Sequence, residues 1–303
     1  MASSTQITEK HFKKLNIKCN FKFNIQNIGY VKHYKQNMLT YLDDKKYIEN
    51  VNRNKNIKVL IIDKRLKKSL LRKSIKTISV KHPKYEFLNI WNLISKERYK
   101  SRKTIIDKSA LIHKSSYISD SNVIIGKNVI IHPNATILAD VNIGDNCTIH
   151  SGCVLGTAFI NKKTSKGIKQ FFHDGKLIIK NNVEILTNCS LDKGNSLNGN
   201  TIIGKNTKIS HMCYIAHSSR IGEDCLLHGN LSVLGGSKIG NRVNINPGST
   251  IGGWVKIGDD ATIIVNSVVV SNVKANAKVS GHYAIDSKLF MKKYKDLFSS
   301  PFK

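Results

Sequence analysis

The sequence predicts a mainly β fold: a left-handed parallel β-helix of hexapeptide repeats, with a small N-terminal α/β domain and a C-terminal helix. The main observation is that every sixth residue from Ile203 to Val269 is aliphatic, without a slip. An α-helix repeats every 3.6 residues and a flat strand every two, so neither gives a pure period of six. Three short strands of six residues each complete one triangular turn of a β-helix, which does give this period.

Two shorter runs of the same period precede the long one. Their aliphatic positions are Ile125, Ile131, Ile137, Ile143, Ile149 and Leu155, and then Ile179, Ile185 and Leu191. At three hexads to a coil, the three runs predict seven coils. Ile106, Ile112 and Ile118 predict one more, less regular coil, and the seven-residue step from Ile118 to Ile125 indicates a one-residue slip.

Two other positions of the hexad agree with this register. The residue three after each aliphatic is mostly Asn, Gly or Asp, which tolerate the positive φ of a corner. The residue four after it is small or β-branched and is expected to point inward. Five of the six cysteines occupy this inward position: Cys147, Cys153, Cys189, Cys213 and Cys225. We therefore expect them to pack as small hydrophobes, and since no C-x-x-C pair exists, we predict no metal site.

The repeats divide the chain into three parts. Residues 1–103 have no hexads and are predicted to form a small α/β nucleotide-binding domain, with a strand at 59–63 and an amphipathic helix at 84–99. Residues 104–275 are predicted to form the β-helix domain. Residues 276–303 are predicted to form a helical tail, with its helix at 284–298.

Two insertions interrupt the hexads, at 157–177 and at about 192–201. Insertions in such repeat proteins emerge at one edge and are often functional.

Composition limits the partners of the chain. There is no apolar run long enough for a membrane span and no signal-peptide core, so we expect a cytoplasmic protein. The net charge of +29 fits nucleic acid, a membrane surface or anionic small molecules, and it also fits a lysine-rich coding bias. Because the lysines are spread along the chain and no RNA-binding motif is present, we expect no nucleic acid partner.

His217 is the strongest catalytic candidate among the eleven histidines. It follows an inward isoleucine by two residues, so it is expected to point outward at a corner. Gly235 and Gly253 lie one and two coils further on and leave the space beside the imidazole open to an acyl arm. Transfer of an acyl group from a thioester to an amine needs a base and a donor for the oxyanion, which His217 and the Gly235 N–H would supply. Spacing alone leaves a purely structural histidine as an alternative.

Several motifs resemble those of the UDP-3-O-acylglucosamine N-acyltransferases of lipid A synthesis and of related N-acyltransferases for nucleotide-linked amino sugars. These motifs are VEILTNCSLDKG (183–194), IAHSSRIG (215–222), VLGGSKIG (233–240), IKQFFHDGKLII (168–179) and TYLDDKKY (40–47). The resemblance covers nearly the whole chain, strongly over 105–275 and weakly before 100. It implies that His217 is the general base, that Gly235 binds the oxyanion, and that the protein is a homotrimer with sites between subunits.

The resemblance also implies the remaining site residues. Tyr41, Asp44 and Tyr47 match the nucleotide-contacting stretch, and we expect substrate contacts from Phe159, His173, Asp192 and Lys193. We expect Gly253, Trp254, Lys162 and Lys163 to contact the acyl donor, because clustered lysines suit its phosphates.

Three departures from the family pattern concern the substrate. Trp254 replaces a second histidine of the lipid A enzymes, Ser210 and His211 replace an Asp-Asn pair, and Asp44 replaces an asparagine. We therefore expect an N-acyltransferase that moves an acetyl or other short acyl group from acyl-CoA to a nucleoside-diphosphate-linked amino sugar.

The enzymatic alternative is the lipid A enzyme itself, with an acyl-carrier-protein donor. The non-enzymatic alternative is a scaffold without activity. A carbonic-anhydrase-like site is disfavoured because no suitably spaced histidine triad is present. The sugar, the base and the acyl length stay open.

Overall fold

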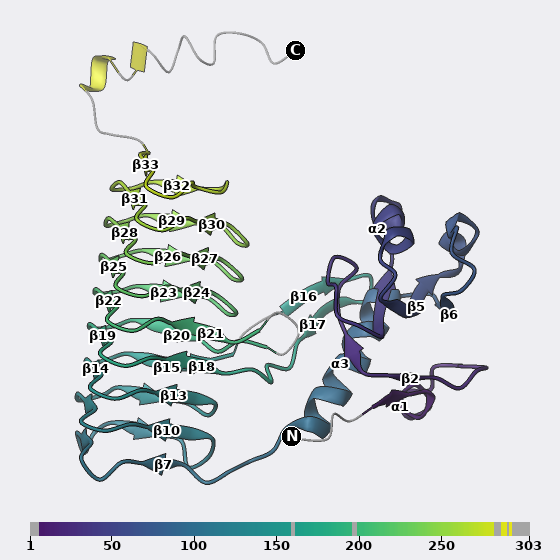
Figure 1. Ribbon diagram of the computed structural model, residues 1–303, viewed down its shortest axis with the longest axis horizontal. Helices are drawn as coiled ribbons and strands as arrows, with labels where there is room; N and C mark the ends of the chain where they lie inside the picture. Colours follow the sequence, from purple (N-terminus) through teal and green to yellow (C-terminus); the bar gives the residue numbers. More distant parts are fainter. Residues whose placement is uncertain (1–5, 159–160, 196–198, 282–285, 290, 293–303) are drawn as a thin grey trace.

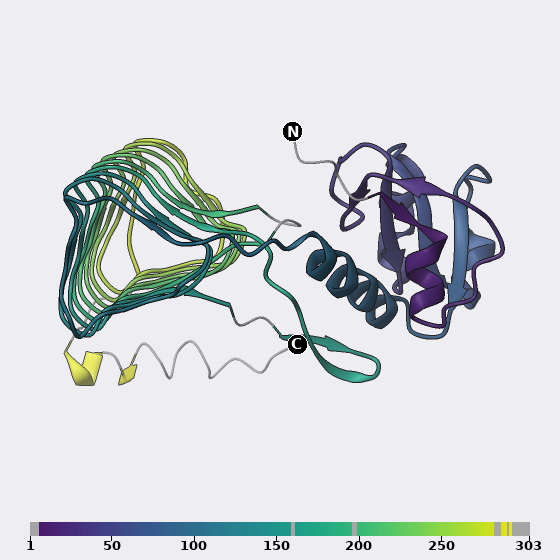
Figure 2. The same ribbon diagram turned by 90° about the horizontal axis from the view of Figure 1, so that it is seen from below.

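The computed structural model describes residues 6–158, 161–195, 199–281, 286–289 and 291–292. A tall stack of short strands forms one part of the molecule, and a smaller region of helices and longer strands lies beside it (Figure 1). We refer to residues 6–98 as the front region. Seen along the stack, the strands outline a triangle (Figure 2).

The front region contains a four-stranded parallel sheet in the order β3-β4-β5-β6 and a two-stranded antiparallel sheet, β1-β2. Its strands are β1 (Ile7–Thr8), β2 (Asn24–Ile25), β3 (Asn27–Ile28), β4 (Met38–Leu42), β5 (Ile57–Asp63) and β6 (Lys76–Val80). Its helices are α1 (Glu9–Lys14), α2 (Ile48–Arg53) and α3 (Pro83–Arg98), with 3₁₀ turns η1 (Lys45–Tyr47) and η2 (Lys64–Ser69).

The core of the front region explains why α3 lies on the sheet. Phe87, Ile90, Trp91 and Ile94 recur at helical spacing, and none is more than 1% exposed. Pro83 occupies the first turn of the helix, where its missing N–H leaves no hydrogen bond unmade.

The stack consists of three parallel sheets, and successive strands of the chain belong to successive sheets. One sheet contains β7 (Ile105–Ile106), β10 (Val123–Ile125), β13 (Val141–Ile143), β18 (Leu177–Ile179), β21 (Thr201–Ile203), β24 (Arg220–Ile221), β27 (Lys238–Ile239) and β30 (Lys256–Ile257). A second contains β8 (Leu111–Ile112), β11 (Ile130–Ile131), β14 (Thr148–Ile149), β19 (Glu184–Ile185), β22 (Lys208–Ile209), β25 (Leu226–Leu227), β28 (Asn244–Ile245), β31 (Thr262–Ile263) and β33 (Lys278–Val279). The third contains β9 (Tyr117–Ile118), β12 (Thr136–Ile137), β15 (Val154–Thr157), β20 (Ser190–Asp192), β23 (Tyr214–Ile215), β26 (Ser232–Val233), β29 (Thr250–Ile251) and β32 (Val268–Val269).

This arrangement confirms the predicted left-handed parallel β-helix. The aliphatic positions of the long run are all at most 6% exposed, and the inward positions from Thr207 to Ser267 are at most 4% exposed. The corner residues adopt positive φ, for example 54° at Asn128 and 76° at Gly236. The less regular first coil is also present, because β7, β8 and β9 pair with β10, β11 and β12.

Both insertions leave the β-helix from the same sheet. The larger one follows β15 and forms an antiparallel hairpin of β16 (Asn161–Thr164) and β17 (Gly167–Gln170) before the chain re-enters at β18. The smaller one follows β20. At the other end, β33 extends its sheet beyond residue 275. Much of the helix predicted at 284–298 lies outside the described residues, and residues 287–289 and 291–292 within it are helical.

None of the helices in the described ranges is long and apolar enough to cross a membrane.

Candidate active site

His217 lies two residues after the end of β23, at a corner of the β-helix. The next residue, Ser218, has a φ of 60° and turns the chain toward β24. One coil further on, a Cβ atom placed on Gly235 would lie only 2.5 Å from Nε2 of His217, closer than non-bonded atoms approach. The imidazole therefore requires glycine at position 235.

The Gly235 N–H is placed to act as a donor. Across the described part of the chain, no backbone carbonyl accepts a hydrogen bond from it, whereas the neighbouring Gly236 N–H donates to the His217 carbonyl at 3.0 Å. A free N–H beside an imidazole is the combination that an oxyanion site for acyl transfer needs.

The surroundings of His217 favour its neutral form. Burial, followed by the charges of His173 and Lys162, lowers its pKa to about 4. Its Nδ1 atom is buried without a hydrogen-bond partner among the residues described. A neutral imidazole at pH 7 can accept a proton from a substrate amine.

His173 returns from the hairpin and contacts His217 edge to face, with 5.9 Å between ring centroids. It is 3% exposed, and within the described ranges neither ring nitrogen has a partner at hydrogen-bonding geometry. Burial lowers its pKa, although the Lys193 backbone and the charges of Asp192 and Asp174 oppose that shift. Unpartnered nitrogens on a buried histidine indicate that a substrate or water completes this site.

A row of aromatic contacts positions His173. The ring of Phe171 stacks on Trp91 of α3 at 5.2 Å and contacts His173 at 5.9 Å. Beside this stack, Asn92 donates to the Gln170 carbonyl at 2.9 Å and accepts from the Phe172 N–H at 2.9 Å. The front region therefore fixes the path of the returning strand.

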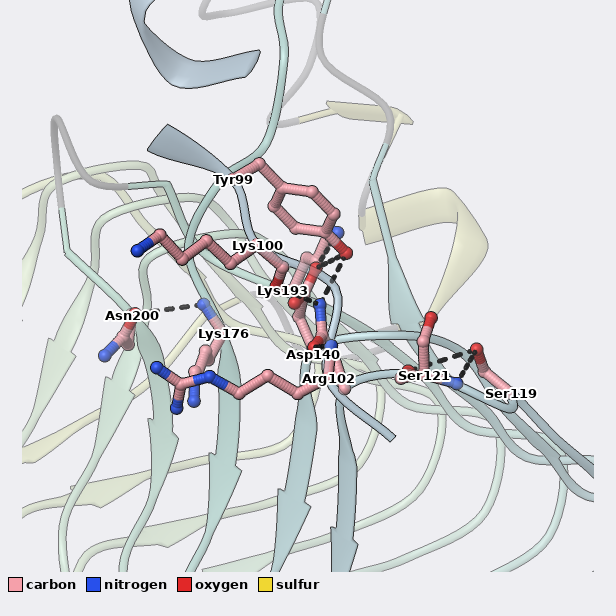
Figure 3. Close-up of polar contacts among 10 residues, drawn as sticks. Tyr99, Lys100, Arg102, Ser119, Ser121, Asp140, Lys176, Lys193 and Asn200 are labelled. Atoms are coloured by element: carbon pink, nitrogen blue, oxygen red, sulfur yellow. Dashed lines mark hydrogen bonds and ion pairs between the residues drawn. The ribbon is translucent and has the colours of Figure 1, made fainter. Parts of the chain in front are cut away.

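Asp192 and Lys193, both expected to contact substrate, have their charged groups engaged inside the protein. Asp192 is 4% exposed and accepts hydrogen bonds from Thr157 and, at 2.7 Å, from Tyr214. The Lys193 ammonium lies 2.6 Å from Asp140, which also accepts from the Tyr99 hydroxyl at 3.1 Å (Figure 3).

The sequence reasoning missed Thr157, Tyr214, Asp140 and Tyr99. These residues form the buried polar network around Asp192 and Lys193. Pairing register is the signal that could have found two of them, since Thr157 pairs with Asp192 and Ser190 pairs with Tyr214 on neighbouring coils.

The residues expected at the donor site fall into two groups. Trp254 is 59% exposed, has a φ of 65° and covers Gly236, where a Cβ would lie 2.6 Å from its indole. A bulky residue with positive φ is strained, which is common at functional sites. A Cβ added at Gly253 would lie 3.3 Å from the Gly235 carbonyl oxygen, a tight contact, so a side chain there would crowd Gly235.

The two donor-site lysines lie on opposite faces of β16. Lys162 is half-buried and Lys163 is exposed. Phe159, another predicted contact residue, lies outside the described residues.

The predicted nucleotide stretch is at the end of β4 and in η1. The Tyr41 ring packs against Phe87 of α3 at 4.8 Å, and burial raises its pKa. Asp44 accepts from the Lys46 N–H at 3.0 Å, and that hydrogen bond lowers its pKa. The Lys46 ammonium lies 5.1 Å from the centroid of the Tyr47 ring. The structure therefore groups these three residues apart from His217, with α3 between them.

No cluster of three or more metal-ligating side chains occurs in the ranges that the structure describes. This corner combines the neutral imidazole of His217, the backbone N–H of Gly235 and the charge of Lys162. Such groups suit proton transfer and anion stabilisation.

The family model described as bacterial transferase hexapeptide (six repeats) matches residues 122–157 and 218–253. A UDP-3-O-acylglucosamine N-acyltransferase from Bordetella pertussis is 31% identical over 150 residues, which are 47% of this chain and 40% of that protein. The enzyme of the same name from Campylobacter lari is 30% identical over 136 residues, which are 44% of this chain and 41% of that protein. The match thus spans about two fifths of these relatives' length.

Solved structures with a similar fold include a UDP-N-acetylglucosamine O-acyltransferase from Moraxella catarrhalis. It has 25% identity and a TM-score of 0.41, covering 66% of this chain and 85% of that one. A perosamine N-acetyltransferase from Caulobacter crescentus, solved with CoA and GDP-perosamine, has 16% identity and a TM-score of 0.28, covering 78% and 72%. TM-scores this low support no functional argument. The two stretches that the family model matches lie within the β-helix and keep the register of its repeats, so the chain carries hexapeptide repeats of the kind that the model describes.

Proposed function

We propose that the protein is an N-acyltransferase that moves an acyl group from a thioester to the amino group of a nucleoside-diphosphate-linked amino sugar. The observation that supports this most is the His217–Gly235 corner. There a neutral imidazole lies against a glycine whose N–H has no backbone acceptor in the described residues.

The proposed reaction needs no covalent enzyme intermediate. The sugar amine attacks the thioester carbonyl while His217 accepts the amine proton, and the Gly235 N–H donates to the oxyanion. Collapse of the tetrahedral intermediate breaks the C–S bond, and His217 returns the proton to the leaving thiolate. The products are an amide and a free thiol.

The acceptor would extend from the front region to the corner. Tyr41, Asp44 and Tyr47 would hold the base, and His173 would contact the sugar through its unpartnered nitrogens. Acyl-CoA with a short acyl group is the proposed donor, with Trp254 and Gly253 beside its arm.

The alternative acceptor is the lipid A precursor, with an acyl-carrier-protein donor. The curated relatives with this activity favour it. Trp254 and the Ser210–His211 pair favour the first proposal, because they change positions where the lipid A enzymes have other residues.

A homotrimer is part of the proposal. Leu111, Ile130 and Leu226 point outward from one sheet of the β-helix with 38–66% of each residue exposed. Apolar side chains aligned on one face suit a second copy of the chain. Analytical ultracentrifugation at micromolar concentration tests the trimer directly.

The test of activity is to incubate the protein with nucleotide amino sugars and with acetyl-CoA or long acyl-carrier-protein thioesters, and to follow thiol release. His217→Ala should fold normally and lose about 10²–10⁴ in kcat. Near wild-type turnover in this variant would reject His217 as the base. Consumption of only the long thioester with the lipid A precursor would establish the alternative.

A further inference from the structure

Hairpin β16–β17 places two lysines directly opposite each other. Lys162 pairs with Lys169 in the antiparallel register, so both side chains point to the same face of the hairpin. Both are half-buried, whereas Lys163 and its partner Ile168 are exposed on the other face. We call the face with Lys162 and Lys169 the inner face. Like charges placed opposite each other across a hairpin are destabilising unless an anion lies between them.

The inner face packs against the start of α3. The ammonium groups of Lys166 and Lys169 lie 4.8 and 5.1 Å from the ring centroid of Tyr85, in the first turn of the helix. Ser165 at the hairpin tip lies 2.7 Å from the ring of His82, the residue before the helix. Lys84 lies in that same first turn.

The cations at this junction lack ion-pair partners. No carboxylate of the described residues forms an ion pair with Lys84, Lys162 or Lys169. Burial and the charge of Lys84 together lower the pKa of Lys162. The acid that Lys84 influences is Asp43, beyond the end of β4. A bound anion would stabilise half-buried cations that repel one another.

We propose that the inner face of the hairpin and the first turn of α3 form a binding site for a diphosphate, with Lys84, Lys162 and Lys169 as its cationic ligands. The inference rests on the proposed function for the source of the diphosphate, which is either the nucleotide sugar or CoA. The site lies between the end of β4 and His217. On one side the charge of Lys84 acts on the carboxylate of Asp43, and on the other the charge of Lys162 acts on the imidazole of His217.

Such a site would couple ligand binding to catalysis. The charge of Lys162 lowers the pKa of His217, together with burial and the charge of His173. A bound diphosphate would offset the charge of Lys162 and make His217 a stronger base only when substrate is present. The other charged groups near this pair, Asp192, Asp174 and Lys193, act on His173, whose charge in turn lowers the pKa of His217.

The test uses the full chain and inorganic pyrophosphate as the probe, by isothermal titration calorimetry. Lys162→Gln and Lys169→Gln should each weaken pyrophosphate binding about 10- to 100-fold, because each removes a charge-assisted hydrogen bond. Lys180→Gln, at an exposed lysine just after β18 and outside the hairpin, is the matched control and should change the affinity less than about twofold. Equal losses in all three variants, or no binding to the wild-type chain, would overturn the proposal.

A thermal shift measurement keeps the proposal testable if heats are small. Without ligand, Lys162→Gln should melt no lower than wild type, since it removes a repulsion. Pyrophosphate should raise the Tm of wild type and of Lys180→Gln, but not of Lys162→Gln. An equal rise in Lys162→Gln contradicts the site.

Two further experiments identify the source of the diphosphate and test the binding site separately from the proposed function. If Lys162→Gln loses affinity for UDP but not for CoA, the site binds the acceptor. If it loses affinity for CoA but not for UDP, the site binds the donor. If no acyl transfer is found but pyrophosphate binding follows the pattern above, the proposed function fails and the site stands. If acyl transfer occurs with unchanged KM values in Lys162→Gln and Lys169→Gln, the site is rejected and the function stands.

Discussion

The β-helix and the front region hold their functional residues in different ways. In the β-helix, residues one coil apart stack directly on each other, as Tyr214 does on Ser232. The register therefore fixes which residues of neighbouring coils lie beside a side chain such as His217. In the front region, Tyr41 is placed by packing against Phe87 and Tyr30, which come from other elements. The comparison suggests that the β-helix supplies the chemistry and the front region supplies adaptable binding.

The hydrophobic cores of the β-helix and of the front region are built from residues of different size. At the inward position the β-helix uses small residues whose hydroxyls or thiols donate to a carbonyl fifteen residues further on, as Ser237 does to Gly252 and Cys213 to His228. The front region instead buries large aromatic side chains, including Trp91, Phe87 and Phe12. Substitutions should therefore be tolerated differently in the two regions.

The sharpest test of the β-helix as a rigid frame is Gly235→Ala. Its new Cβ would lie 2.5 Å from His217 Nε2, so the imidazole must move. We expect kcat to fall about 100-fold, since a displacement of roughly 1 Å at a catalytic group has this effect. Gly229→Ala is the control, because its Cβ would come no closer than 3.3 Å to any neighbour, the His211 carbonyl, and would not touch His217. Unchanged kcat in Gly235→Ala would show that the frame is not rigid at this corner.

A pH series compares one histidine from each region. The pKa values of His33 in the front region and His217 are both lowered to about 4, mainly by burial. As pH falls below about 6.5, the unfolded chain binds these protons first, so stability is lost between pH 6.5 and 4. Each histidine should account for on the order of 1–2 kcal/mol of this loss, after allowance for solvent screening.

Chemical denaturation of His33→Gln and His217→Gln across this range measures both contributions. Each variant should show a smaller loss of stability on acidification than wild type. The acidic limb of kcat/KM should lie near pH 4, since His217 stays neutral above that value. The same acidic limb of kcat/KM should be present in His33→Gln. A limb at pH 6.5 would contradict the low pKa of the base.

The front region is expected to affect binding more than turnover. Tyr41→Leu keeps apolar volume but removes the ring, so KM for the nucleotide sugar should rise about tenfold with kcat unchanged, as for the loss of uniform binding. Tyr34→Leu is the control, because Tyr34 is 75% exposed. Steady-state kinetics distinguishes the outcomes, and a fall in kcat at saturation would remove the division of roles between the regions.

The smallest effect is expected for Cys213→Ser. A buried hydroxyl without a partner would cost more than 1 kcal/mol, but here the His228 carbonyl already accepts from the thiol at 3.2 Å. Ser237 makes the equivalent bond at 2.8 Å. We expect a loss below about 1 kcal/mol in urea denaturation. A larger loss would mean that the inward position is less tolerant than its composition indicates.

The contacts around His217 show where prediction from the sequence ended. The repeat places Gly235 beside the histidine, because the distance along the chain between stacked residues is constant. It does not place His173, Lys162 or Lys193, which belong to insertions outside the repeat. The network that engages Asp192 was missed for the same reason, since Thr157 is the first residue of the larger insertion.

The sequence by itself determined the β-helix, its register, its corners and the outward position of His217. Each of these follows from one local rule repeated every six residues. Only the tertiary structure decided which groups surround that histidine. The returning strand is fixed by Trp91 and Asn92, about eighty residues earlier in the chain. Contacts between segments so far apart depend on packing between two cores, and no periodicity in the sequence encodes them.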